Sequence, residues 1–156
     1  MKRISIYCFL AAALLFLTTF YFVGIIYDLF FSFFEHDPIQ FLVTDLGGGF
    51  LESIRISIAI AIIPLSALLV WKAGRVTRPG DRVLSVLVIL FFIMVSNAVN
   101  VFRIKSLARL TPTPVAISYP FDKVYIEYFI LGGIIIGAFL SYFLYKEKSN
   151  PLPPVA

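Results

Sequence analysis

Four apolar runs constrain the fold of this chain more than any other feature. Residues 4–27, 56–71, 83–102 and 128–145 contain no charged side chain. Crossing a bilayer takes about 20 mostly apolar residues, and the second and fourth runs extend outward past Glu52 and Glu127 to reach that length. The runs therefore predict four transmembrane helices, at about residues 4–31, 51–72, 83–103 and 124–146.

Composition supports lipid as the solvent for these runs. Hydrophobic residues make up 60% of the chain and charged residues 14%, against about 45–50% and about 25% in soluble domains. The predicted fold class is all-α, a four-helix transmembrane bundle forming one membrane domain over residues 1–149. The first run is longer than the apolar region of a secretory signal, about 7–15 residues, so it is expected to remain as a helix. Three prolines in residues 150–156 predict a disordered C-terminal tail.

The basic residues predict the orientation in the membrane. Short cytoplasmic loops of membrane proteins are enriched in Lys and Arg. Both termini are therefore expected in the cytoplasm, in a multi-pass protein of the cell inner (plasma) membrane. This orientation places eight basic residues inside (Lys2, Arg3, Lys72, Arg75, Arg78, Arg82, Lys146, Lys148) and five outside (Arg55, Arg103, Lys105, Arg109, Lys123). Because these charges flank membrane spans, the formal charge of +4 does not indicate a nucleic-acid partner.

The residue inventory gives little support for catalysis. Cys8 is the single cysteine and His36 the single histidine, so an intramolecular disulfide and bis-histidine haem ligation within one chain are excluded. No His-based metal set and no cofactor are expected. An enzymatic reading requires Glu52, Arg55 and Glu127 to converge on a lipid headgroup, and we expect a protein that is not an enzyme.

Polar side chains within the spans are more informative. Asn97 and Asn100 are three residues apart, so they share a helix face, and Asn97 lies roughly 21 Å from the cytoplasmic start of its helix. Hydrogen bonds between helices are the ordinary role for such asparagines. Glu52 and Arg55, also three apart, predict an ion pair at the outer end of their helix. For both pairs the alternative is a recognition surface that opens to the outer side.

The remaining polar candidates are expected in the same half of the membrane. Glu127 marks the outer end of the fourth helix and Arg103 that of the third. A proton or ion pathway needs polar groups through the whole membrane. Because the polar groups gather in the outer half, a transport route through one chain is not expected.

Small residues predict close helix packing. Gly133 and Gly137 have the spacing that lets helix backbones approach each other. Their partner is either the first helix of the same chain or another molecule, and the contact within the chain is favoured. Pro64 predicts a kink midway along the second helix.

The layout resembles that of the four-helix inner-membrane immunity proteins, which protect a bacterium from its own pore-forming bacteriocin. The resemblance concerns helix number, orientation and size, and it transfers no residue role. It implies a protein that binds another membrane protein or a toxin inside the bilayer.

Two further functions stay open at this point. One is an accessory subunit of a larger transporter, secretion or respiratory complex. The other is a homo-oligomeric channel or small transporter with its pore between protomers.

Overall fold

The computed structural model describes residues 2–33, 49–109 and 124–149, and these form four helices. The helices are α1 (Lys2–Ser32), α2 (Gly49–Ala73), α3 (Pro79–Arg109) and α4 (Ile126–Ser149). Each is long and apolar enough to cross a membrane, so the predicted all-α, four-helix fold class is confirmed. The predicted tail at 150–156 lies outside the described residues.

The largest difference from the sequence-based boundaries is at the end of α3. The helix continues through Lys105 to Arg109, where a loop was expected from Arg103 onward. The edge of the hydrocarbon limits where charged side chains can lie, but it does not end the backbone hydrogen bonding of a helix.

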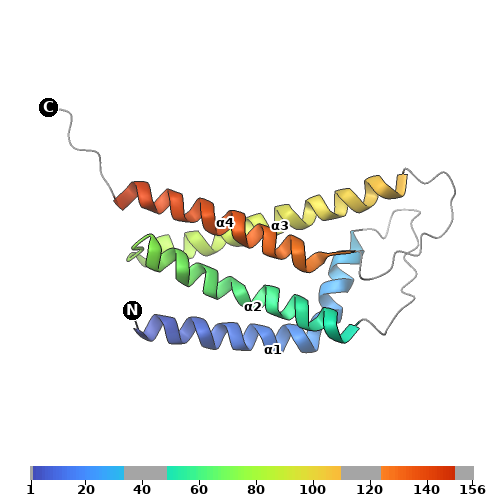
Figure 1. Ribbon diagram of the computed structural model, residues 1–156, viewed down its shortest axis with the longest axis horizontal. Coiled ribbons are helices and arrows are strands. Elements are labelled where there is room, and N and C mark those ends of the chain that lie inside the picture. Colours follow the sequence, from blue (N-terminus) through green and yellow to red (C-terminus); the bar gives the residue numbers. More distant parts are fainter. Residues whose placement is uncertain (1, 34–48, 110–123, 150–156) are drawn as a thin grey trace.

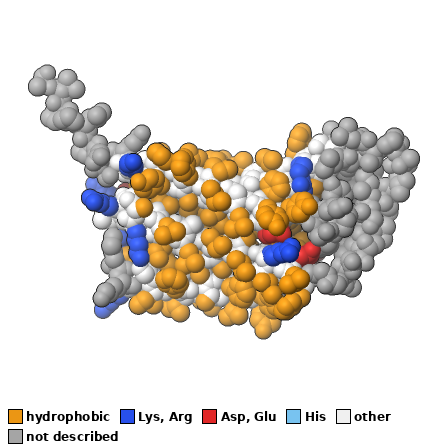
Figure 2. Space-filling model, viewed as in Figure 1, with side chains coloured by type: hydrophobic (Ala, Val, Ile, Leu, Met, Phe, Trp, Pro, Cys, Tyr) orange, Lys and Arg blue, Asp and Glu red, His pale blue; other side chains and the backbone are white. Residues whose placement is uncertain are grey.

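The helices alternate in direction and define two ends of the molecule (Figure 1). The start of α1, the turn between α2 and α3, and the end of α4 lie at one end, which we call the Arg75 end. The end of α1, the start of α2, the end of α3 and the start of α4 lie at the other, which we call the Glu52 end. Hydrophobic side chains cover the middle of the face in Figure 2, with Lys and Arg toward both ends.

The spanning helices pack in the order α1, α2, α4, α3. In an 18-residue apolar window of each span, 44% of the residues are buried in α2, against 11% in α1 and 17% in α3. α2 is therefore the central helix, and α1 lies at the edge of the bundle with most of its surface uncovered.

Two glycines set the closest contact in the fold. A Cβ added at Gly133 would lie 2.5 Å from the Cα of Ile93, and one at Gly137 would lie 2.7 Å from the Cα of Ile89. Both atoms belong to the backbone of α3. The close approach predicted for these glycines is therefore confirmed and lies within the chain, but the expected partner, the first helix, is wrong. The partner is α3.

The contact continues along both helices toward the Arg75 end. Ser141 Oγ donates to the main-chain carbonyl of Ser85 at 3.5 Å, and the Tyr145 hydroxyl donates to that of Asp81 at 2.8 Å. Each step of four residues along α4 is thus matched by a step of four back along α3. The two helices form a regular antiparallel pair, joined by one backbone contact or hydrogen bond per turn.

α1 changes direction at Phe22, where φ is −112° and ψ is 20°. The segment before it, residues 2–21, is about 30 Å long, enough to cross a bilayer. The shorter segment after it turns across the ends of its neighbours (Figure 1), where Phe30 is buried in one cluster with Val124. By contrast α2 is a continuous helix through Pro64. The interruption of helical geometry therefore falls in α1, not at the proline.

Candidate functional site

Asn100 links two helices at the Glu52 end. Its side chain is fully buried, and Nδ2 donates to the main-chain carbonyl of Val124, just before α4, at 2.8 Å. Asn100 Oδ1 is also buried and accepts no hydrogen bond from the described residues. The expected interhelical role of this asparagine is confirmed, because its amide fixes the start of α4 against α3.

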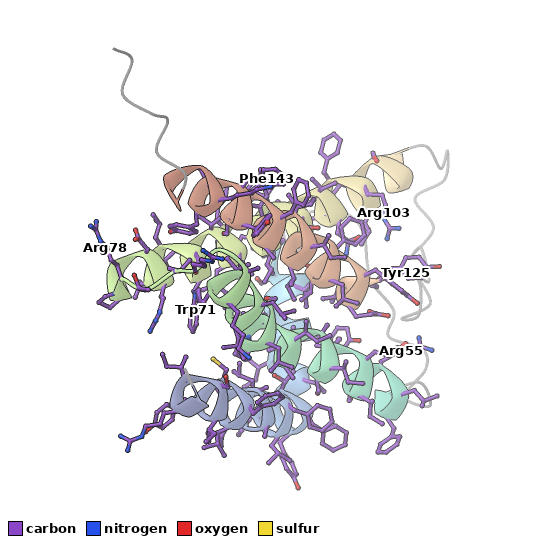
Figure 3. The ribbon with its side chains drawn as sticks, turned by 60° about the vertical axis from the view of Figure 1, so that its left-hand side comes forward. Arg55, Trp71, Arg78, Arg103, Tyr125 and Phe143 are labelled. Carbon is purple, nitrogen blue, oxygen red and sulfur yellow. The ribbon has the colours of Figure 1, made fainter. Side chains whose placement is uncertain are left out.

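Arg103 lies one turn further along the same helix and meets the same segment. Its Nη2 is 3.5 Å from the Val124 carbonyl oxygen, and its guanidinium lies 5.2 Å from the ring centre of Tyr125 and 5.4 Å from that of Phe129 (Figure 3). Aromatic faces attract cations, and more strongly where water is excluded. The guanidinium of Arg103 is therefore held beside two aromatic rings and a carbonyl at the end of the bundle.

Two buried carboxylates complete this group, which we call the Glu52-end polar cluster: Tyr27, Glu52, Asn100, Arg103 and Glu127. Glu52 and Glu127 are 7% and 8% exposed and lie in the first turns of α2 and α4. The N-terminus of a helix carries partial positive charge, which favours an anion there. Both carboxylates lie within electrostatic range of the Tyr27 hydroxyl from α1. All four helices therefore contribute to the cluster.

Arg55 does not join the cluster. It is exposed on α2, while Glu52 is buried, and no ion pair joins the two in the part of the chain that the structure describes. The predicted ion pair is therefore wrong. The physical reason is that residues three apart on a helix differ in direction by about 60°, enough to place one inside and the other outside. Figure 3 shows Arg55 at the same end as Arg103 but apart from it.

Asn97 differs from Asn100 in the same way. It is half-buried, and its Nδ2 donates to the Ile93 carbonyl of its own helix at 2.9 Å. The expectation that both asparagines bond between helices therefore holds for Asn100 alone. Asn97 lies about 9 Å inward of Arg103, within the span and at the edge of the α3–α4 contact.

The half of the bundle toward the Arg75 end has a different polar chemistry. Ser66 and Ser85 each donate to a main-chain carbonyl of their own helix at 2.7 Å, and the Trp71 indole donates to Ser85 Oγ at 2.7 Å. The two serine hydroxyls thus bond within their own helices, and the Trp71 indole joins α2 to α3. Gly133 and Gly137 hold α4 close to α3 between the two ends.

The cluster offers hydrogen-bonding and charged groups rather than a metal site. Within residues 2–33, 49–109 and 124–149, no three His, Cys, Asp or Glu side chains lie close enough to hold a metal ion. His36 lies outside these ranges. Two acidic groups, one basic group, one phenol and one carboxamide, all at least partly buried, can fix the relative positions of the helix ends.

Two contributors were missed by the sequence reasoning. Tyr27 ends the first charge-free run and Tyr125 precedes α4, with a left-handed backbone at φ 56°. Nothing in the sequence placed Tyr125 beside Arg103, or Tyr27 beside two carboxylates from other helices.

No protein-family model, no curated protein and no solved structure matches this chain.

Proposed function

We propose that this integral membrane protein acts by binding another membrane protein inside the bilayer, through the surface of α3 around Asn97. The form of this function that we favour is protection against a pore-forming toxin whose helices enter the membrane, as the layout of four helices implies. The partner class is thus an apolar helix that carries a polar side chain at the depth of Asn97.

The single observation that supports this surface is the half-buried amide of Asn97 within a membrane span. A carboxamide has two donor hydrogens and an acceptor oxygen, and the hydrogen bond to the Ile93 carbonyl oxygen uses one of the two donors. Exposing the rest to hydrocarbon is unfavourable unless a partner forms hydrogen bonds with it. A partner helix supplies such bonds, whereas lipid tails do not.

The surroundings of Asn97 suit a docking helix. Met94, on the preceding turn, is 72% exposed, and Ala98 beside it is exposed and small. Helix association in lipid relies on packing and interhelical hydrogen bonds rather than on apolar burial. A small residue next to a flexible one lets a second helix approach the amide closely.

The experiment places a photo-crosslinking amino acid at Met94 and, as a matched control, at Val99. Val99 is 54% exposed and lies at nearly the same depth, about 200° around α3 from Asn97. Cells that express these variants are challenged with pore-forming toxins after deletion of the native gene. We expect a light-dependent adduct with the toxin from position 94 and none from position 99.

A substitution at Asn97 gives the second measurement. Asn97→Leu removes the amide, and an interhelical hydrogen bond in a membrane contributes about 0.6 kcal/mol on average and about 1.7 at most. Affinity for the partner should therefore fall roughly 3- to 18-fold, and protection of the cells should fall with it.

The outcomes separate the competing functions. If position 94 crosslinks to a constitutive membrane protein in unchallenged cells, the function as an accessory subunit is favoured over immunity. An adduct of the chain with itself favours the homo-oligomeric channel. Equal adducts from positions 94 and 99, together with full function of Asn97→Leu, refute the proposed surface.

A further inference from the structure

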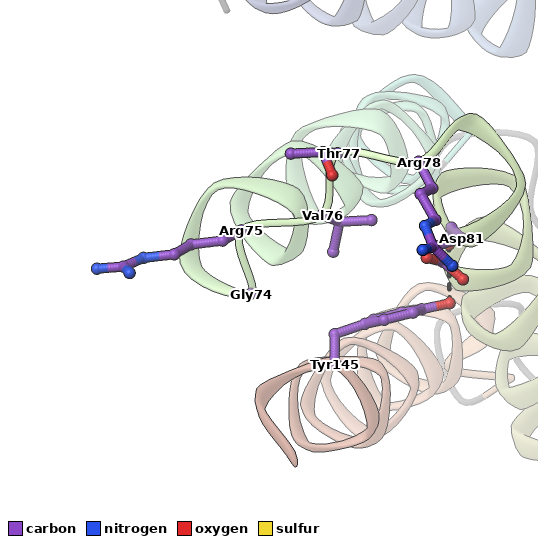
Figure 4. Close-up of a pocket in the computed structure, with 7 residues that line it drawn as sticks. All are labelled: Gly74, Arg75, Val76, Thr77, Arg78, Asp81 and Tyr145. Carbon is purple, nitrogen blue, oxygen red and sulfur yellow. Dashed lines mark hydrogen bonds between the residues drawn. The ribbon is translucent and has the colours of Figure 1, made fainter. Parts of the chain in front are cut away.

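A second polar site lies at the opposite end of the molecule, where the α2–α3 turn meets the end of α4. It is an open pocket of about 220 Å³ (Figure 4). Its lining residues are Gly74, Arg75, Val76, Thr77, Arg78, Asp81 and Tyr145. None of these residues belongs to the Glu52-end polar cluster or to the Asn97 surface.

The backbone of the turn is fixed by hydrogen bonds. The amide of Val76 donates to the Trp71 carbonyl at 2.9 Å and that of Arg75 to the Lys72 carbonyl at 3.4 Å. This is the helix ending in which one residue takes a left-handed conformation, usually glycine. Here Arg75 takes it, with φ 50°. The turn therefore holds an arginine at a defined place beside the pocket.

The pocket has an excess of positive charge that the fold leaves available. Arg75 and Arg78 are exposed, and neither guanidinium forms a hydrogen bond or ion pair among the described residues. Asp81 is the single acidic residue in the lining. The Tyr145 hydroxyl donates to the main-chain carbonyl of Asp81 at 2.8 Å and so closes one wall. An arginine guanidinium binds phosphate oxygens through paired hydrogen bonds.

Aromatic residues place the pocket at the membrane boundary. Trp71 lies next to the α2–α3 turn, and the Arg82 guanidinium is 5.8 Å from the centre of its ring. The Lys146 amine is 5.9 Å from the ring centre of Tyr142. Trp and Tyr are enriched where the hydrocarbon meets the headgroups. We therefore expect a pocket at this level to face lipid phosphates.

We propose that this pocket binds a phosphate group, and that the headgroup of an anionic phospholipid supplies it. Arg75 and Arg78 contact the phosphate oxygens, the Thr77 hydroxyl donates a further hydrogen bond, and the lipid tails lie along the apolar sides of α2 and α4. Basic pockets between transmembrane helices bind anionic headgroups by this chemistry.

The test uses the full-length chain purified in a detergent with a zwitterionic headgroup. Short-chain phosphatidylglycerol is titrated in, with short-chain phosphatidylcholine and soluble glycerol phosphate as the comparison ligands. Trp71 is the single tryptophan of the chain and lies beside the turn, so its emission reports occupancy directly. Native mass spectrometry of the same samples counts the bound lipids.

Four variants give the expected pattern. Each basic side chain that contacts an anionic headgroup contributes about fivefold in affinity, so Arg78→Gln should weaken binding about fivefold and Arg75→Gln with Arg78→Gln about 25-fold. Lys72→Gln removes the same charge at the same end from an exposed residue outside this pocket, and should change affinity less than about twofold. Asp81→Asn removes the opposing charge and should strengthen binding.

The comparison ligands show whether a lipid headgroup or a soluble phosphate compound supplies the bound phosphate. Binding of phosphatidylglycerol without competition by glycerol phosphate supports the lipid headgroup. Equal binding of glycerol phosphate keeps the phosphate site but refutes the lipid as its source. Binding of phosphatidylcholine as tight as that of phosphatidylglycerol, an unchanged double arginine variant, or an equal loss in Lys72→Gln overturns the proposal. The opposite sign expected for Asp81→Asn excludes misfolding as the cause of the arginine effects.

Discussion

Gly133 is the position where one added methyl group tests the α3–α4 contact most directly. In Gly133→Ala the new Cβ would lie 2.5 Å from the Cα of Ile93 and 2.7 Å from the Phe92 carbonyl oxygen, whereas ordinary contacts are 3.4–4 Å. Both neighbours are backbone atoms of a helix, so no side chain can rotate to make room. The helices must separate by about 1 Å at this turn, which forfeits a quarter to a half of the attraction between the facing atoms.

The expected magnitude follows from studies of overpacked interiors. Inserting a methyl group into a tightly packed contact costs about 1–3 kcal/mol in free energy of unfolding. Gly137→Ala should behave similarly, because its Cβ would lie 2.7 Å from the Cα of Ile89. The measurement is the unfolding equilibrium of the purified chain in mixed micelles of increasing SDS content, followed by circular dichroism.

Gly132 provides a matched control at the adjacent position. A Cβ there would lie 3.7 Å from Ser96 Oγ, an ordinary contact. Alanine is also the better helix former, by up to about 1 kcal/mol. Gly132→Ala should therefore leave stability unchanged or raise it. If Gly133→Ala unfolds at the same SDS content as Gly132→Ala, the direct backbone contact between α3 and α4 is refuted.

Two further predictions follow from the polar residues and the ends of the bundle. Asn100→Leu should lower the free energy of unfolding by about 1–3 kcal/mol, because the Val124 carbonyl oxygen then keeps only Arg103 Nη2, at 3.5 Å, as a donor. Asn97→Leu should change the free energy of unfolding by less than about 0.5 kcal/mol. The reverse order in the same SDS titration would contradict the assignment of Asn100 as the internal asparagine. In a chain with Cys8→Ser, a membrane-impermeant maleimide applied to intact cells should label Gly49→Cys and spare Thr77→Cys, and the opposite labelling would invert the predicted orientation.

The number of helices and the positions of their apolar spans could be predicted, because the bilayer sets the length of a span. Which helices are neighbours could not be predicted, since a span that is apolar on every side has no face marked for packing. The spacing of Gly133 and Gly137 indicated a close approach, but their partners Ile89 and Ile93 are isoleucines like many others in the spans.

The candidate site was predictable in its residue types and less so in its geometry. Glu52, Asn100, Arg103 and Glu127 belong to one cluster at one end, as their positions in the chain indicated. Whether each faces inward depends on helix rotation, which is set by packing against neighbours. Arg55 and Asn97 therefore differ from their partners three residues away.

The local backbone geometry of the helices was the hardest feature to predict from the sequence. Phe22 has no proline beside it, yet the helical dihedrals of α1 are interrupted there. Phe30, after Phe22, is buried in one cluster with Val124, which lies just before α4, and tertiary contacts of this kind are not encoded in the local sequence. Pro64 carried the local signal for a kink, and α2 is continuous through it.

The matched steps of four residues along α3 and α4 restrict how this protein can change shape. Sliding one helix past the other by less than a turn would drive a side chain such as that of Ile134 into the α3 backbone, so only jumps of a whole turn, about 5.4 Å, restore a fitting arrangement. We therefore expect α3 and α4 to move together. A rearrangement on binding a partner is then expected where α2 meets α4, or where α1 bends at Phe22.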